Sequence, residues 1–373
     1  MKVLHLVKTT YGGIWAFRLM REQVKQGLEV HVATPVDDGP MIPWYKEWGI
    51  KTHAINYSLK QLLKNRRELK AIVEEVKPDI IHSHFVLTTV IMRLALRRNS
   101  AKRVFQVPGP LHLEHFLYRN VDILLSQKQD YWIPTCNWSY QRYIKSGVKP
   151  DHLLMSYYGG DGLTYEVKKG VLRSELGLTD RDIIIAIVAF MYPPKRYLGQ
   201  RRGLKGHEDF IDAMSIVMEK HPNVHAVCIG GAWNSATDYE NKVINYGTKK
   251  CPRIHFLGTR NNVLELYQDI DIAIHPSHSE NLGGAGESLA MGVPTIATNT
   301  GGFPDIVIDG ITGYLVPLNS PSSIAAAVEK MIQDPKHAKE MALVGQKKVL
   351  EDTDVRKTSV EVVNFYKKIC AVE

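Results

Sequence analysis

Short apolar segments alternate with helical patterns along the whole chain, and this alternation constrains the possible folds more than any other feature. Apolar strands are expected at residues 2–7, 29–33 and 80–84 in the first part of the chain, and at 183–188 and 224–229 in the second. Strands that alternate with helices form parallel sheets with helices on both faces. The sequence therefore predicts an α/β protein built from doubly wound sheets.

A polar, charged segment that ends at about residue 182 interrupts this pattern before it starts again. The length of 373 residues also favours two domains over one. We therefore predict an N-terminal domain at residues 1–163 and a C-terminal domain at residues 164–354. Since ligands of doubly wound sheets bind at the carboxyl ends of the strands, we expect the binding site in a cleft between the two domains.

The composition indicates a cytoplasmic protein. Hydrophobic residues make up 44% of the chain, yet no run approaches the roughly 20 apolar residues that a membrane-spanning helix needs. The apolar run at residues 2–7 is broken by Lys8 and is too short for the core of a signal peptide. The cysteines are scattered and lack the spacing of zinc ligands, so we expect buried, reduced thiols at Cys136, Cys228, Cys251 and Cys370.

The excess of positive over negative charge lies entirely in the first domain. Residues 1–163 contain 23 Lys and Arg against 14 Asp and Glu, a net charge of +9, whereas the rest of the chain carries −1. Basic residues cluster at 60–70 and at 93–103, several of them at helical spacing. Such a face could meet an anionic lipid surface, nucleic acid or an acidic substrate, and a merely solvated face is the alternative.

One segment of the second domain combines the groups that bind a sugar nucleotide. Residues 276–294 join two carboxylates, Glu280 and Glu287, through the glycine pair Gly283 and Gly284, which leads into a helical pattern. Carboxylates accept hydrogen bonds from sugar hydroxyls, and bare amides at a helix N-terminus favour an anion such as phosphate. This segment resembles the donor-binding signature of the retaining GT-B glycosyltransferases of family 4.

The resemblance continues through residues 297–307 and 309–317 and spans nearly the whole chain. It implies the GT-B fold, in which two Rossmann-like doubly wound domains face each other across a cleft, with a C-terminal helix at about 355–373 that crosses back onto the first domain. It also implies that Glu280 contacts the donor sugar and Glu287 the ribose hydroxyls. The family places seven residues between these acids, and this chain has six. The donor-binding turn between them comprises Asn281, Leu282, Gly283 and Gly284.

Residues 205–211 resemble the family segment in which a lysine binds the donor diphosphate and a glycine opens a helix, which assigns this role to Lys205. A cation at that place stabilises the negative charge that grows on the leaving phosphate. Relatives also carry an arginine directly after the preceding strand, where this chain has the apolar residues 189–191. An inserted loop carries Lys195 and Arg202, and we expect one of its basic residues to replace that arginine.

The first domain contributes a glycine pair and a histidine. Gly12 and Gly13 follow the first strand and resemble the family's glycine pair that lets the backbone approach the donor phosphate. They do not form the G-x-G-x-x-G pattern of nicotinamide enzymes. His84, at the end of a strand, resembles the family histidine close to the reacting sugar, and a core histidine with satisfied hydrogen bonds is the alternative. His112 and Glu114 are predicted to lie on the acceptor side.

Together these patterns predict a retaining glycosyltransferase that uses a UDP- or GDP-linked sugar, with His84, Lys205 and Glu280 as catalytic residues. The resemblance implies that the leaving phosphate oxygen takes the acceptor proton. No Asp-x-Asp segment lies in a plausible site, so we expect activity without a metal ion or other cofactor. The basic first domain suggests a glycan acceptor carried on a lipid at the inner face of the membrane, as in surface polysaccharide assembly, with the protein bound there peripherally.

Three other functions stay open at this point. A nucleotide-sugar epimerase could use a similar two-domain scaffold. A non-catalytic sugar-nucleotide sensor would account for the shortened spacing of the acids and the missing arginine. Nucleic-acid binding is motivated by the basic charge, but the acidic second domain and the absence of aromatic-basic recognition motifs argue against it. We therefore expect no nucleic-acid partner.

Overall fold

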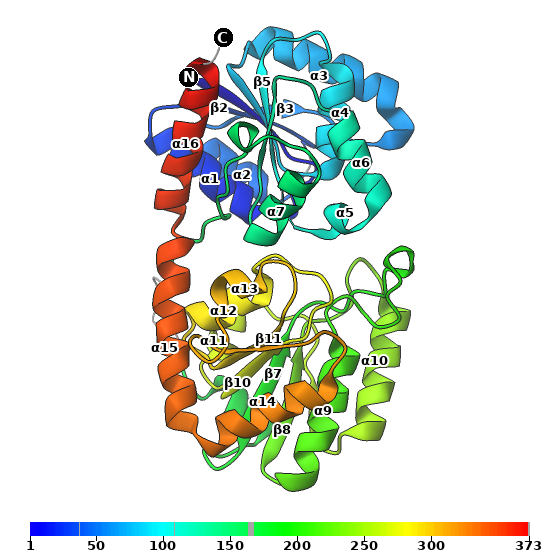
Figure 1. The fold of residues 1–373 in the computed structure, drawn as a ribbon, viewed down its shortest axis with the longest axis vertical. Helices are drawn as coiled ribbons and strands as arrows, with labels where there is room; N and C mark the ends of the chain where they lie inside the picture. The colour runs from blue at the N-terminus through cyan, green and yellow to red at the C-terminus, as the bar shows by residue number, and fades with distance from the viewer. Residues whose placement is uncertain (37, 108, 163–167, 372–373) are drawn as a thin grey trace. The chain divides into compact units, whose positions relative to one another are not determined.

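The computed structural model describes residues 1–36, 38–107, 109–162 and 168–371, and the chain divides into two compact units (Figure 1). Unit 1 comprises Met1–Asp161 and Asp352–Glu373, and unit 2 comprises Gly162–Glu351. The predicted boundary between residues 163 and 164 lies outside the described residues. The second junction falls at Glu351 rather than at residue 354, because a hydrogen bond of 2.7 Å from the Gly160 amide to the Thr353 carbonyl ties this stretch to unit 1.

Unit 1 contains a six-stranded sheet in the order β3-β2-β1-β4-β5-β6, with every neighbouring pair parallel. Its strands are β1 (Lys2–Leu6), β2 (Glu29–Thr34), β3 (Lys51–Ala54), β4 (Ile80–Ser83), β5 (Lys102–Gln106) and β6 (Asp130–Ile133). Its helices are α1 (Ile14–Lys25), α2 (Met41–Glu47), η1 (Leu59–Gln61), α3 (Leu62–Val76), α4 (Val86–Ala95), α5 (Leu111–Glu114), α6 (Phe116–Leu124), α7 (Asn137–Lys145), η2 (Pro150–His152) and α16 (Val355–Ala371).

Alternate residues of the central strands in unit 1 face two different helical layers. Leu4, Leu6 and Ile81 pack with α3 and α4 in one hydrophobic core, whereas Val3 and Ile80 pack with α16 in another. This alternation follows from the two-residue period of a strand, and it requires apolar residues on both faces. Figure 1 shows α3, α4 and α6 on one side of this sheet, and α1 with α16 on the other.

Unit 2 repeats the architecture of unit 1, with a parallel six-stranded sheet in the order β12-β11-β10-β7-β8-β9. Counted within each unit, both sheets have the doubly wound order 3-2-1-4-5-6. The strands of unit 2 are β7 (Ile183–Val188), β8 (Val224–Ile229), β9 (Ile254–Phe256), β10 (Ile272–His275), β11 (Thr295–Thr298) and β12 (Tyr314–Val316). Its helices are α8 (Val171–Leu176), η3 (Arg196–Leu198), α9 (His207–Lys220), α10 (Thr237–Lys250), α11 (Val263–Tyr267), α12 (Gly283–Ala290), α13 (Phe303–Ile306), α14 (Pro321–Gln333) and α15 (Pro335–Asp352).

The predicted fold class is therefore confirmed, but the sequence pattern does not reveal β3, β6 and β12. All three lie at the edges of their sheets, and each has only three or four residues. β3 has no buried residue that would mark it as apolar, and β12 has only one. The sequence does predict the central strands of both sheets.

No helix within the described ranges combines the length and the apolar character that crossing a membrane requires. All four cysteines are free, and three of them are buried as expected. Cys370 is exposed instead, and it lies in the last turn of α16 next to the buried Ile369.

Candidate functional site

A cavity of about 370 Å³ opens in unit 2 at the carboxyl ends of β7, β8 and β10. This is the edge at which doubly wound sheets bind their ligands, and the cavity has the size and mixed lining of a small-molecule site. Its lining consists of Val188, Ala189, Phe190, Tyr192, Lys205, Ile229, Gly230, Thr259, Arg260, Val263, Leu264, His275, Ser277, Glu280, Gly283, Gly284 and Glu287.

The predicted donor-binding groups Lys205, Glu280 and Glu287 all line this cavity. The Lys205 ammonium forms an ion pair with the Glu280 carboxylate, and 18% and 14% of the two side chains are exposed. The ammonium also lies 5.6 Å from the centre of the Tyr192 ring, a cation–π contact. Burial and, secondarily, the Glu280 charge raise the pKa of Tyr192 to about 12, so this phenol stays neutral. The cavity therefore holds one ammonium, fixed between a carboxylate and an aromatic face.

The glycine-rich turn brings bare backbone to the cavity. Gly284, in the first turn of α12, lies against His275, and a Cβ atom there would approach the Nδ1 atom of that ring to 2.7 Å. The absence of a side chain lets the helix begin against the sheet, so its N-terminus, where backbone amides have no partner within the helix, lies at the cavity. Burial, and to a smaller extent the Lys205 charge, lowers the pKa of His275 to about 3, and its Nε2 lies 3.0 Å from the Ser288 hydroxyl. His275 is therefore neutral, and Lys205 supplies the positive charge.

The shortened spacing between the acids does not remove Glu280 from the site. Gly301, which follows β11, has a φ of 53°, and a Cβ atom there would collide with the backbone carbonyl of Glu280. The next amide, that of Gly302, donates to the same carbonyl at 3.2 Å. Close contact between the two loops thus fixes the Glu280 backbone and places its carboxylate at the cavity. Asn281 and Leu282 lie outside the lining, where the Asn281 amide donates to the Glu280 carboxylate at 3.1 Å.

The inserted loop does not provide the second cation that the sequence predicts. Arg202 donates to Asp209 at 2.8 Å and pairs with Asp212 at 2.6 Å, so two acids of α9 hold it away from the cavity. Lys195 precedes the turn η3 and also lies outside the lining. The cavity instead contains Arg260 from the loop after β9, which is paired with a surface glutamate.

Sequence analysis does not identify several residues of the lining. Arg260 and His275 belong to no motif of the chain, and Ser277 lies in the 276–294 segment without being singled out, but each lies at or just beyond the carboxyl end of β9 or β10. Strand ends are the positions where doubly wound sheets carry function. A search of the residues that follow each predicted strand would have included all three.

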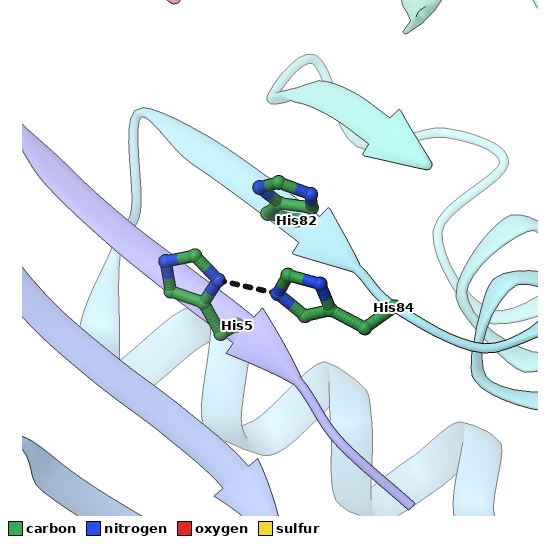
Figure 2. Close-up of side chains that lie close together, drawn as sticks. All are labelled: His5, His82 and His84. Atoms are coloured by element: carbon green, nitrogen blue, oxygen red, sulfur yellow. Dashed lines mark hydrogen bonds between the residues drawn. The ribbon is translucent and has the colours of Figure 1, made fainter. Parts of the chain in front are cut away.

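In unit 1, His84 belongs to a buried cluster with His5 and His82, from the neighbouring strands β1 and β4 (Figure 2). The Nδ1 atom of His5 lies 2.8 Å from Nε2 of His84, and the other nitrogen of His5 lies 2.7 Å from the Gln23 side-chain oxygen. The second nitrogen of His84 lies 3.1 Å from the Tyr158 hydroxyl. His82 bonds to the Tyr366 hydroxyl through Nδ1, which connects the sheet to α16.

The cluster has the geometry of hydrogen-bonded neutral rings. Ligand nitrogens of the three histidines lie within 4.8 Å of one another, an arrangement that could attract a metal ion. However, the facing nitrogens of His5 and His84 are at hydrogen-bond distance, and the His82 and His84 rings stack at 4.2 Å between centres. Burial is the largest cause that holds the pKa values of His82 and His84 well below the usual range, and the neighbouring histidines lower them further. This matches a core histidine with satisfied hydrogen bonds, and contact of His84 with the sugar stays a prediction.

Lowering the pH should destabilise this cluster. Burial lowers the pKa of His5 to about 4 from 6.5, with the bond to Gln23 opposing the shift. Since the unfolded chain binds more protons than the folded one between these values, stability falls as the pH drops through this window. His5 alone should lower the free energy of unfolding by about 2 kcal/mol between pH 7.5 and pH 5.

Urea unfolding at the two pH values measures this effect. His5→Gln should be less stable than the wild type at pH 7.5 but lose less stability on acidification. His337→Gln, which changes a half-exposed histidine of unit 2, should keep the pH dependence of the wild type. Equal pH dependences of His5→Gln and the wild type would contradict the assignment of the effect to the cluster.

The other predicted residues of unit 1 are the glycine pair before α1 and the two acceptor-side candidates, His112 and Glu114. Gly12 and Gly13 lead into α1, and Gly13 is its N-cap with a φ of 89°. His112 is buried and lies 3.2 Å from the Tyr143 hydroxyl and 3.7 Å from the Asp122 carboxylate, and its role as an acceptor-side group stays a prediction. A buried polar cluster around Asp122 holds it inside unit 1. Glu114 ends α5 and is half-buried.

Comparisons with known proteins agree with this geometry. Residues 196–348 match the family described as glycosyl transferases group 1, and residues 12–157 match Glycosyltransferase Family 4. EpsD of Bacillus subtilis, which carries the name of a glycosyltransferase, is 24% identical over 88% of this chain and 91% of its own length. The D-inositol 3-phosphate glycosyltransferase of Corynebacterium aurimucosum is 28% identical over 70% of this chain and 65% of its own length.

The fold is also that of a solved structure. Anabaena Alr3699/HepE, solved in complexes with UDP and with UDP-glucose, superposes with a TM-score of 0.81 at 20% identity, over 99% of this chain and 100% of that one. Between them, the two family matches include every residue described above as a donor-binding candidate except Lys195 and the lining residues before it. The chain is a glycosyltransferase with the GT-B fold, in which residues 12–157 are similar to Glycosyltransferase Family 4 and residues 196–348 to the glycosyl transferases group 1.

Proposed function

We propose that the protein transfers a sugar from a UDP-linked donor with retention of configuration at the anomeric carbon. The observation that carries this proposal is the convergence of Lys205, Glu280 and Glu287 around one cavity at the strand ends of unit 2. A UDP-linked donor is preferred to a GDP-linked one because HepE, with the same fold, was solved with UDP and UDP-glucose.

The lining offers a complementary group for each part of the donor. Lys205 and the N-terminus of α12 are groups that bind anions, and they suit the diphosphate. Glu287 accepts hydrogen bonds from the ribose hydroxyls and Glu280 from the sugar hydroxyls. The apolar side chains of Val263 and Leu264, on the wall beside Thr259, form a surface against which the base can pack.

Retention follows from reaction on the face of the sugar that the leaving group occupies. The bond between the anomeric carbon and the phosphate oxygen breaks, and a bond from that carbon to the acceptor oxygen forms. The acceptor proton passes to the departing phosphate oxygen, so no side-chain base is needed. Lys205 stabilises the charge that accumulates on the diphosphate, and this electrostatic effect is the main contribution of the site to the rate.

Donor binding is the direct test of this assignment. A sugar nucleotide at about 100 times its dissociation constant should add ~2.7 kcal/mol to the free energy of unfolding. A thermal-shift series with UDP-, GDP- and ADP-sugars should show the largest shift with a UDP-sugar, and Glu287→Ala should remove it. If none of these donors shifted the unfolding temperature, the proposal would be contradicted. Release of an isomerised donor without any acceptor would favour an epimerase instead.

Turnover should not depend on a divalent ion. The lining contains two carboxylates, Glu280 and Glu287, and the first is already paired with Lys205, which supplies the charge that a metal would otherwise bring. We expect full activity in excess EDTA, measured as release of the nucleoside diphosphate. Loss of activity that magnesium restores would refute this expectation.

We further propose that the acceptor is a glycan carried on a lipid at the inner face of the membrane, in the assembly of a surface polysaccharide. The support for this acceptor is the net charge of +9 in residues 1–163. A positive surface attracts a protein to anionic lipid, where such acceptors lie.

A further inference from the structure

The helix α6 exposes its apolar residues. Leu117, Val121 and Leu124 have the spacing of one helical stripe, and 51%, 36% and 81% of their surfaces are exposed. Phe116, at the start of the helix, is 64% exposed. The apolar stripe of a surface helix normally faces the core, and here the only buried residue of the helix is Asp122. The helix is therefore reversed relative to the usual orientation.

A buried ion pair fixes this reversed orientation. Asp122 is paired with Arg93 of α4, and it accepts a hydrogen bond of 2.7 Å from the Tyr143 hydroxyl. Burial by itself would raise the pKa of Asp122, but the Arg93 charge and the hydrogen bonds outweigh it and hold that pKa below the usual range. Rotating the helix to bury its leucines would expose or break this pair. The apolar stripe is thus held toward solvent by the fold.

Basic residues lie on the same side of unit 1 as this stripe. The helix α4 packs against α3 and is joined to α6 by the pair between Arg93 and Asp122, so the three helices form one layer (Figure 1). Two further leucines, Leu59 in η1 and Leu63 in the first turn of α3, are 65% and 68% exposed. Exposed basic side chains surround them and follow α4, at Lys60, Lys64, Arg67, Lys70, Arg97 and Arg98.

We propose that this layer docks on an anionic lipid bilayer, with the α6 stripe inserted at the boundary of the acyl chains and the basic residues of α3 against the lipid phosphates. Helices that expose leucine and phenylalanine together with lysine and arginine bind membrane surfaces in this way. The centre of a protein–protein interface is depleted in lysine, whereas here Leu63 and Lys64 are adjacent and both exposed. The inference deepens the proposed function, because it names the surface through which a lipid-borne acceptor is reached.

Vesicle sedimentation tests the docking. The wild-type protein should bind vesicles of phosphatidylglycerol and phosphatidylcholine in equal parts, and it should bind phosphatidylcholine alone much more weakly. Leu117→Gln/Leu124→Gln should lower binding to the anionic vesicles about tenfold, because glutamine does not enter the acyl boundary. The matched control is Leu343→Gln/Val344→Gln, two half-exposed apolar residues of α15 in unit 2, which should bind like the wild type. No binding by the wild type, or equal binding by all three proteins, would overturn the proposal.

Two further measurements separate this proposal from its rivals. If sedimentation velocity shows a wild-type dimer that Leu117→Gln/Leu124→Gln converts to a monomer, a second copy covers the stripe and the lipid proposal is wrong. The thermal shift with UDP-glucose should be the same in that variant and in the wild type, which shows that the variant is folded. Vesicle binding without any donor shift would refute the proposed function and leave the docking surface supported.

Discussion

Replacing Lys205 with alanine is expected to lower the rate of sugar transfer by about 10²–10³-fold, the usual loss when one charge-stabilising group is removed from an active site. The Lys205 side chain is partly exposed in the cavity and contacts Glu280 and Tyr192 rather than the core. The fold should therefore persist, and circular dichroism and the unfolding temperature should match those of the wild type. Single-turnover release of the nucleoside diphosphate at saturating donor measures the effect on the chemical step.

The inserted loop provides a matched control for this variant. Lys195→Ala removes a lysine ten positions earlier that lies outside the cavity lining, and it should keep a rate close to that of the wild type. Arg202→Ala should also transfer sugar, because Asp209 and Asp212 hold Arg202 away from the cavity. A normal rate in Lys205→Ala, or a collapse in Lys195→Ala, would move the charge-stabilising role to another residue and refute the proposed geometry.

The second large effect is on stability, and it concerns the residue that orients α6. Asp122→Ala should lower the free energy of unfolding by about 3–5 kcal/mol, because it leaves the buried Arg93 guanidinium without its nearest carboxylate. Asp130 lies 3.3 Å from the same guanidinium, but it is already shared with Arg103 at 2.5 Å. Urea unfolding at neutral pH measures the loss.

A matched acid on the surface of the same unit controls for the change of charge. Glu74→Ala, on the exposed side of α3, should change the free energy of unfolding by less than about 0.5 kcal/mol. If Asp122→Ala were as stable as Glu74→Ala, the buried pair would not be what holds α6 in its reversed orientation. In that case the exposed leucine stripe would need another explanation.

Much of the donor site could be predicted because its residues are close together in the sequence. Glu280, Gly283, Gly284 and Glu287 lie within one turn and the helix that follows it, so their spacing alone places them on one side of a strand end. The order of strands and helices was likewise readable, since the central strands are buried on both faces and are therefore rich in apolar residues.

The roles of single charged groups could not be predicted in the same way. The sequence offers Lys195 and Arg202 as possible second cations beside Lys205, and nothing in the local pattern of the inserted loop decides between those two. Only Lys205 lines the cavity, because the carboxylates of α9 bind Arg202 and Glu280 binds Lys205. Arg260 reaches the same cavity from a loop that carries no recognisable motif.

The sequence by itself determined that this protein has two doubly wound units and a turn suited to a sugar diphosphate, because periodicity and local spacing are properties of neighbouring residues. The tertiary structure alone decided that His112 is buried beside Asp122 and that α6 turns its leucines outward. Both outcomes depend on the pair between Asp122 and Arg93, which are 29 positions apart. Burial of a charge is stable only beside its partner, and which partner is near is known only once the chain has folded.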